Sequence, residues 1–327
     1  MSLFSAASAL RTSFSDDGSE PHGFELDLGG SEATMPARAV SYHVLGHSND
    51  VDFVFGAGLA LGGNFYFGIL PGRFRTTDTY TSGSEDGSDF NITINFRGRV
   101  DEELKQAFVD AADLISSFIL SDIPDAFLGG LGILRDNTVD DVTITASVVD
   151  IDGEGGVLGQ AGPTATRVEG GLPATGFMQF DEADAFNFND AGLFNDIVFH
   201  EMMHVVGYGT IWDALGLVTE NLDGTADFNG ANVAIAFAEE FGSGTPAIET
   251  EGGPGTAGGH WNEAGTDGTT FDNEIMTGFI NENGNYLSNM TIASLEDLGY
   301  DTVFDSSNPL DATSGLDLSI FNDLAVT

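Results

Sequence analysis

The segment Leu193–Gly207 reads LFNDIVFHEMMHVVG and decides the fold of the chain. Its apolar residues recur at helical spacing up to His200, which predicts an amphipathic helix, and Asp190 is expected to cap it. Residues four apart on a helix lie on the same face, so the imidazoles of His200 and His204 point to one place. Two neutral imidazoles suit Zn²⁺, and Glu201 stands beside them as a carboxylate that is not a ligand.

A catalytic zinc ion needs a third protein ligand and one open position. Three of the six histidines, His22, His43 and His47, lie in an N-terminal region without a clear pattern, which leaves His260 as the remaining histidine. Gly207 favours a downstream ligand, because a glycine there lets the helix stop and the chain turn back. The alternative third ligand is a carboxylate, from Asp213, Glu220 or Glu263.

Several other segments have the periodicity of regular secondary structure. Asn91–Phe96 alternates apolar and polar residues, which predicts a half-buried strand. Asp101 is expected to cap a following helix, because apolar residues recur at helical spacing up to Phe118. Further strands are expected at Val142–Val149 and Ala174–Phe180, and a last helix at Ile292–Leu298, with Gly299 as its C-cap.

Other segments are expected to be irregular. Thr76–Ser88 is polar and turn-rich, as segments that flank folded units often are. Asp152–Gly171 is rich in glycine and is expected to be a flexible connection rather than a core element. From Gly207 to His260 the chain is expected to consist mainly of loops.

The chain is strongly acidic. The 327 residues include 52 Asp and Glu but only 9 Lys and Arg, for a formal net charge of −43. All nine basic residues lie at or before Arg167. Such a polyanion repels phosphate backbones and anionic lipids, so nucleic acid is excluded as a partner and membrane association is not expected. Because the chain has no cysteine, a metal site must use His, Asp or Glu.

Three loops rich in Asp and Gly suggest a second cation. Carboxylate and carbonyl oxygens are the ligands that Ca²⁺ prefers, so a structural Ca²⁺ ion is one reading of these loops. None has the full spacing of a calcium loop, and solvated turns are the favoured reading. The loops are Asp150–Gly155, Asp223–Gly230 and Asp267–Asp272.

Three segments are candidates for targeting or membrane signals. Met1–Arg11 lacks the basic and apolar regions of a conventional signal peptide. Phe53–Leu70 is uncharged and long enough to span a membrane, but its central Gly-Gly-Asn favours a hairpin. The acidic and aliphatic tail Leu316–Thr327 resembles the uncleaved secretion signals of type I exporters, which suggests an extracellular protein; a fraying terminus is the equal alternative.

Together these motifs resemble a known family. The pattern from His200 to Gly207, with no ligand three residues after the glycine, resembles the metzincin metalloprotease motif interrupted by an insertion. This interruption is typical of leishmanolysin-like peptidases, whose third histidine follows in a His-Trp context. Gly258–Glu263 (GGHWNE) is similar to that context, Asn273–Gly278 (NEIMTG) to the Met-turn, and Thr291–Tyr300 to the helix after it. The resemblance also covers Asn91–Phe96, Asp122–Asp125 and Leu158–Pro163, and spans about residues 87–303.

The resemblance implies an α+β (mixed α/β), metzincin-like zincin. A small twisted sheet and the active-site helix are expected in the N-terminal half, and loops with a short helix in the C-terminal half. The expected parts are a region of uncertain structure and open, propeptide-like role (1–85), catalytic subdomains (86–207 and 208–305) and a tail (306–327). Two features depart from the family. Extra residues between His260 and Met276 look like a loop insertion beside the substrate. The cysteines of eukaryotic members are missing, which suggests a bacterial-type relative.

The resemblance also implies roles for single residues. His200, His204 and His260 are expected to bind zinc, Glu201 to act as general base, and Met276 to form an apolar floor without binding the metal. Trp212 and Trp261 are expected to be packing residues.

The expected function is a secreted zinc endopeptidase acting on proteins or peptides, with contact to a cell surface left open. One alternative is an acidic cell-surface or matrix module with a vestigial or structural zinc site. The other is a zinc hydrolase of a non-peptide bond.

Overall fold

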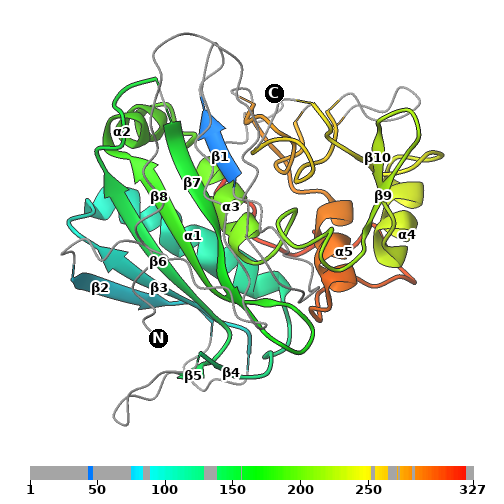
Figure 1. The fold of residues 1–327 in the computed structure, drawn as a ribbon, viewed down its shortest axis with the longest axis horizontal. Coiled ribbons are helices and arrows are strands. Elements are labelled where there is room, and N and C mark those ends of the chain that lie inside the picture. The colour runs from blue at the N-terminus through cyan, green and yellow to red at the C-terminus, as the bar shows by residue number, and fades with distance from the viewer. Residues whose placement is uncertain are drawn as a thin grey trace, which may run out of the picture. The chain divides into compact units, whose positions relative to one another are not determined.

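The structure is a computed structural model that describes residues 43–46, 75–83, 89–128, 138–155, 157–251, 255–263, 271, 273–281 and 284–321 (Figure 1). The hairpin predicted at Phe53–Leu70, the end of the C-terminal tail and most of Asp267–Asp272 lie outside these residues. None of the helices in the described part is long and apolar enough to cross a bilayer.

A six-stranded mixed sheet forms the frame of the N-terminal half, in the order β1-β7-β8-β6-β3-β2. The neighbouring strands β8, β6 and β3 are parallel to one another, and all other neighbouring pairs are antiparallel. The alternating burial of β3 and β6 agrees with the alternation of their sequences. The strands are β1 (His43–Gly46), β2 (Thr76–Thr81), β3 (Ile92–Arg97), β6 (Val142–Val149), β7 (Val157–Thr166) and β8 (Pro173–Asp181).

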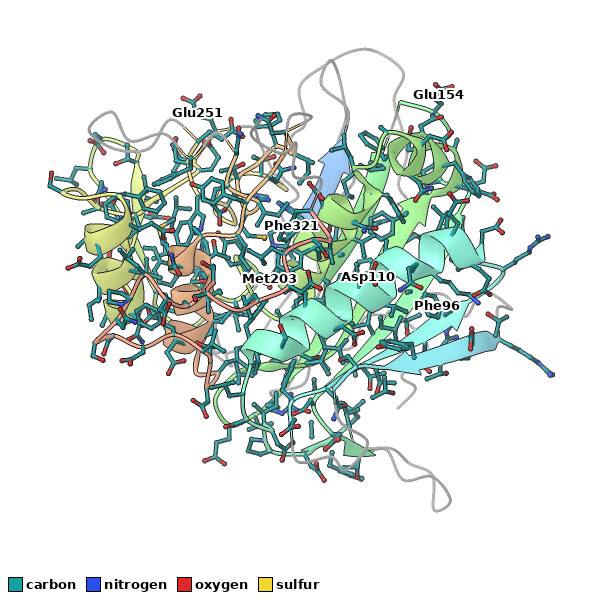
Figure 2. The ribbon with its side chains drawn as sticks, turned by 180° about the vertical axis from the view of Figure 1, so that it is seen from behind. Phe96, Asp110, Glu154, Met203, Glu251 and Phe321 are labelled. Carbon is teal, nitrogen blue, oxygen red and sulfur yellow. The ribbon has the colours of Figure 1, made fainter. Side chains whose placement is uncertain are left out.

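Two long helices pack on one face of this sheet. α1 (Glu102–Phe118) crosses in front of the strands in Figure 2, and α3 (Phe194–Val205) packs against it. Edge-on ring contacts join the layers: the ring centroids of Phe108 lie 5.5 Å from those of Phe96 and Phe180. Asp101 is the N-cap residue of α1 as predicted, but its side chain accepts no capping hydrogen bond. The mixed α+β fold expected from the sequence is therefore confirmed.

Two expectations of irregular structure in this half were wrong. Thr76–Thr81 is the edge strand β2, and Val157–Thr166 is β7, inside the segment expected to be a flexible connection. The glycines of β7 allow close packing rather than flexibility. A Cβ on Gly159 would lie 2.7 Å from the Phe180 ring, so only glycine lets the two strands approach here.

The predicted cap of the zinc-motif helix was also wrong. Asp190 is the last residue of a separate helix, α2 (Glu182–Asp190), whose N-cap Asp181 accepts hydrogen bonds from Ala183 N and Asp184 N. The chain then turns at Gly192, with φ +77°, and α3 starts at Phe194 without a side-chain cap. A short polar helix was missed because its weak apolar pattern does not stand out from a loop.

The C-terminal half contains more regular structure than expected. α4 (Ala231–Glu240) and a small sheet of β9 (Val218–Glu220), β10 (Ala226–Phe228) and β11 (Ala247–Ile248) lie in the segment predicted to be loops. The predicted last helix is α5 (Asn289–Leu298), which starts three residues early and ends, as expected, at Gly299 with φ +112°.

The helices α4 and α5 cap each other with carboxylates. Asp297, near the end of α5, accepts from the backbone N–H groups of Asn232 and Val233 at the start of α4. Glu240, at the end of α4, accepts in turn from those of Asn289 and Met290 at the start of α5. Each carboxylate lies where unpaired N–H groups and the helix dipole favour negative charge. This reciprocal capping joins α4 and α5 at both of their ends.

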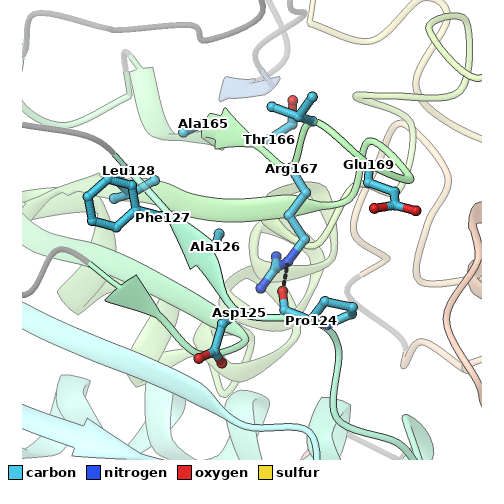
Figure 3. A pocket seen from close by; sticks show the side chains of 10 residues that line it. Pro124, Asp125, Ala126, Phe127, Leu128, Ala165, Thr166, Arg167 and Glu169 are labelled. Atoms are coloured by element: carbon cyan, nitrogen blue, oxygen red, sulfur yellow. Dashed lines mark hydrogen bonds between the residues drawn. The ribbon is translucent and has the colours of Figure 1, made fainter.

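Arg167, the last Lys or Arg of the chain, connects the turn after β7 to the two segments that contain Pro124 and Asp140. Its buried guanidinium group donates to the backbone carbonyl of Pro124 at 2.7 Å (Figure 3). It also donates to the backbone carbonyls of Asp140 and Asp141, at 2.6 and 2.7 Å. The carbonyl of Asp140 precedes β6, and that of Pro124 precedes the short strand β4 (Ala126–Phe127), which pairs with β5 (Thr138–Val139). Arg167 therefore contributes to the frame rather than to an exposed cationic site.

Candidate metal centre

Three imidazole rings meet at the centre of the described structure. Helix α3 places His200 and His204 on one face, with their Nε2 atoms 3.0 Å apart. The Nε2 atom of His260 lies 3.0 Å from that of His200 and 3.2 Å from that of His204. At most 2% of each of the three side chains is exposed. The structure thus brings together two neighbours on one helix and a third residue 56 positions beyond the second.

The second nitrogen of each ring is held by a backbone carbonyl. The Nδ1 atoms of His200, His204 and His260 lie 2.7, 2.9 and 2.8 Å from carbonyl oxygens. Because a carbonyl oxygen only accepts, each Nδ1 must carry the proton and donate. The accepting carbonyls belong to Ile275, Tyr208 and Thr256, respectively.

The neutral tautomer leaves a lone pair on every Nε2 atom. Burial lowers the pKa of His200 to about 4 and that of His260 to about 3, which favours uncharged rings at neutral pH. Three lone pairs facing one another at about 3 Å repel unless a cation lies between them. Nitrogen ligands about 2.0–2.1 Å from a tetrahedral zinc ion lie about 3.3 Å apart, close to the observed separations. The donor set therefore fits a zinc ion.

The chain reverses directly after the second histidine. Gly207 has φ +111°, in the left-handed region that favours glycine, and the hydroxyl of Thr210 donates to His204 O at 2.8 Å. Two residues later, Gly209 also has positive φ, and a Cβ there would lie 2.2 Å from Gly259 O. Gly209 thus lets the segment that carries His260 approach the end of α3. The turn expected at Gly207 is confirmed.

The residue after His260 anchors the third ring in the core. The backbone N–H of Trp261 donates to Met276 O at 3.1 Å, and its indole Nε1 donates to the Thr291 hydroxyl at 2.9 Å. The rings of Trp261 and Trp212 lie 5.0 Å apart, and both side chains are fully buried. The expectation that these tryptophans pack in the core is confirmed, and the absence of a substrate contact stays a prediction.

Glu274 joins the parts that surround the histidines, and sequence reasoning missed it. One carboxylate oxygen accepts from Met276 N at 2.6 Å, and the other accepts from the hydroxyls of Ser288 and Thr291. The carbonyl that holds His200 belongs to the next residue, Ile275. Glu274 lies inside the NEIMTG segment, but nothing in one sequence separates it from the many other acidic residues.

Met276 is fully buried in the turn that follows the carbonyl holding His200. Its own carbonyl accepts from Trp261 N, next to His260. This methionine is therefore linked through its backbone to the segments that carry two of the three rings.

Glu201 is fully buried, and neither of its carboxylate oxygens has a hydrogen-bond partner among the described residues. Burial raises its pKa to about 8, and a divalent cation nearby would favour the charged form. Both oxygens are thus available to accept a proton.

The rival carboxylates are not part of this centre. Among the described residues, the His, Asp and Glu side chains that converge here on one point are the three histidines, without Asp213, Glu220 or Glu263. Asp213 and Glu220 are exposed. In the described loop Asp223–Gly230, Asp223 accepts from the backbone and hydroxyl of Thr225, as in an ordinary polar turn.

Comparison with known proteins gives one family match. Residues 139–309, which are 171 of the 327, match the model of the peptidase family Peptidase_M8, described as leishmanolysin. The matched region contains α3, all three histidines and the turn with Met276. A search of curated proteins finds no match.

Proposed function

The chain belongs to the leishmanolysin family of metallopeptidases, and from this membership we propose that it is a secreted zinc-dependent endopeptidase. The observation that carries the proposal is the convergence of three neutral imidazole nitrogens within 3.2 Å of one another. His200, His204 and His260 would hold the zinc ion, and Glu201 follows His200 directly on α3. Protein or peptide substrates follow from the family.

The proposed hydrolysis of the peptide bond uses the zinc ion, one water molecule and Glu201. When bound, zinc supplies a Lewis acid that polarises a carbonyl oxygen and lowers the pKa of water. Glu201 accepts a proton from the attacking water while the water oxygen bonds to the peptide carbonyl carbon. Glu201 then gives the proton to the amine nitrogen as the C–N bond breaks. The products are an amine and a carboxylic acid, which releases the second water proton to solvent at neutral pH, and no covalent enzyme intermediate forms.

Digestion of casein or gelatin by the full chain tests this function. The proposal predicts cleavage that is lost with a chelator and restored by Zn²⁺. Bound zinc without cleavage of any peptide would favour the cell-surface or matrix module. Turnover of a small ester or amide, with no cleavage of proteins or peptides, would favour the hydrolase of a non-peptide bond.

We place the enzyme outside the cell, because leishmanolysin-like peptidases are typically extracellular or surface proteins. The division into residues 1–85, 86–207, 208–305 and 306–327 stays a prediction, as does export through a signal in the tail. Sequencing the N-terminus of the mature, active form would show whether residues 1–85 are removed.

Substitution of Gly209 by Ala is expected to weaken zinc binding by about 10–100-fold, the loss typical when a ligand is poorly oriented. The added methyl would meet the backbone of Gly259 and push His260 away. Gly216→Ala is a matched control, because Gly216 has φ +73° but its Cβ would meet nothing within 4 Å. Both variants share the strain of a positive φ, so a difference in zinc affinity reports the contact with Gly259. Competition with a chelating dye measures the zinc dissociation constants, and equal values would show that this contact does not position His260.

Substitution of Glu274 by Ala is expected to lower the free energy of unfolding by at least about 3 kcal/mol. It leaves several buried donors without an acceptor, and each costs about 1–3 kcal/mol. Glu239→Ala, at an exposed position, removes the same charge and should change stability little. Denaturant unfolding of both variants with zinc present measures the difference. A Glu274→Ala variant as stable as Glu239→Ala would show that the network does not support the site.

A further inference from the structure

A second site lies where the loop between β6 and β7 meets α2. Asp181, the N-cap of α2, holds the loop with one carboxylate oxygen, which accepts from the backbone N–H groups of Ile151, Asp152 and Gly153 at 2.7–3.1 Å. Its other oxygen accepts from Ala183 N at 2.9 Å. These bonds lower the pKa of Asp181 although burial opposes the shift. Both oxygens of Asp181 therefore accept hydrogen bonds that anchor the loop and the start of α2.

In the next carboxylate, Asp184, only one of the two oxygens accepts a hydrogen bond from the part of the chain that the structure describes. One oxygen accepts from Gly155 N at 2.9 Å, while Oδ2 has no hydrogen-bond partner among the described residues. Only 4% of the residue is exposed. A buried carboxylate oxygen without a partner is unfavourable, and a bound cation would remove that cost.

Asp184 lines a cavity of about 520 Å³ whose other polar side chains also carry oxygen. Asn187 lies three residues further along α2, which places its amide on the same face of the helix. Glu154 comes from the loop itself and is labelled at its tip in Figure 2. The described residues that line the cavity include no Lys, Arg or His. The cavity thus gathers two carboxylates and an amide without a cationic side chain.

We propose that this cavity binds Ca²⁺ through Asp184, Asn187 and Glu154. An all-oxygen donor set from a helix and a loop suits Ca²⁺, which accepts irregular geometry and completes its shell with water. Zinc prefers the imidazole centre, so the two ions would not compete for one site. The ion would give Asp184 Oδ2 its missing partner.

Calcium there would strengthen the frame of the metal centre. It would tie the β6–β7 loop to α2, and α2 packs against α3, which carries His200 and His204. We expect a dissociation constant of about 0.1–1 mM, as in extracellular calcium modules.

Thermal unfolding and calorimetric titration with Ca²⁺ test this site. The full chain is used with zinc present, at constant ionic strength, because any divalent cation screens so acidic a protein. We expect saturable binding and a rise in the unfolding temperature of about 2–4 °C at 10 mM Ca²⁺. Asp184→Asn should lose both effects, whereas Asp190→Asn, an exposed neutralisation on the same helix, should keep them. Equal responses of the two variants would overturn the proposal, as would a wild-type response that does not saturate.

A second variant covers the case in which Asp184→Asn fails to fold. Asn187 is exposed and its side chain makes no hydrogen bond to the other described residues, so Asn187→Ala should fold normally. It should weaken calcium binding at least several-fold relative to Asp190→Asn. Unchanged affinity in Asn187→Ala would exclude this cavity as the site. Zinc content and peptide cleavage are read separately, so failure here leaves the proposed function standing.

Discussion

Replacement of Glu201 by Gln lowers kcat/KM for peptide hydrolysis by about 10²–10⁴-fold, the contribution usual for a general base. The amide has nearly the shape of the carboxylate, so it should fit the same buried position. It cannot accept the proton of the attacking water. Because Glu201 is not one of the three converging residues, the zinc content of the variant should equal that of the wild type. Initial rates of peptide cleavage, with zinc measured on the same samples, check both parts.

Glu220→Gln serves as the control for this variant. It removes the same charge at an exposed position, so its kcat/KM should stay near the wild-type value. A Glu201→Gln enzyme that retained more than about a tenth of the wild-type rate would contradict the role of general base.

Replacement of His260 by Ala should abolish stable zinc binding. Two imidazoles from α3 remain, but the site loses one of the three nitrogens that converge within 3.2 Å. Loss of a direct ligand should exceed the 10–100-fold weakening caused by altered supporting groups. Zinc content after gel filtration, measured by mass spectrometry, is the readout. Peptide cleavage should disappear together with the metal.

The rival carboxylate Asp213 provides the control for the third ligand. Asp213 is exposed and lies outside the group of converging residues, so Asp213→Asn should keep its zinc. Zinc retained by His260→Ala, or lost from Asp213→Asn, would show that the third ligand had been assigned to the wrong residue.

The sequence predicts the zinc-motif helix well because its pattern is local. A spacing of four residues between two histidines on a helix places both on one face, whatever the rest of the fold does. The approach of His260 is different, because it depends on the backbone of Gly209 and Gly259 lying close together. One sequence holds no direct signal of such a contact. His260 was expected from the small number of histidines and from a resemblance, and its role as a ligand stays a prediction.

The errors in the fold have a common physical cause. β7 was taken for a flexible connection because glycine is usually read as a source of freedom, whereas Gly159 serves close contact with the Phe180 ring. The helices α2 and α4 were missed, since tertiary contacts such as the capping of α4 by Asp297 stabilise segments with weak patterns of their own. Strands with clear alternation, such as β3 and β6, were predicted correctly.

Anomalous diffraction at the zinc absorption edge, on crystals of the zinc-loaded chain, tests the central claim most directly. The account predicts one strong peak about 2.0–2.1 Å from the Nε2 atoms of His200, His204 and His260. A peak bound by only the two α3 histidines, with the His260 ring turned away or a carboxylate in its place, would contradict it.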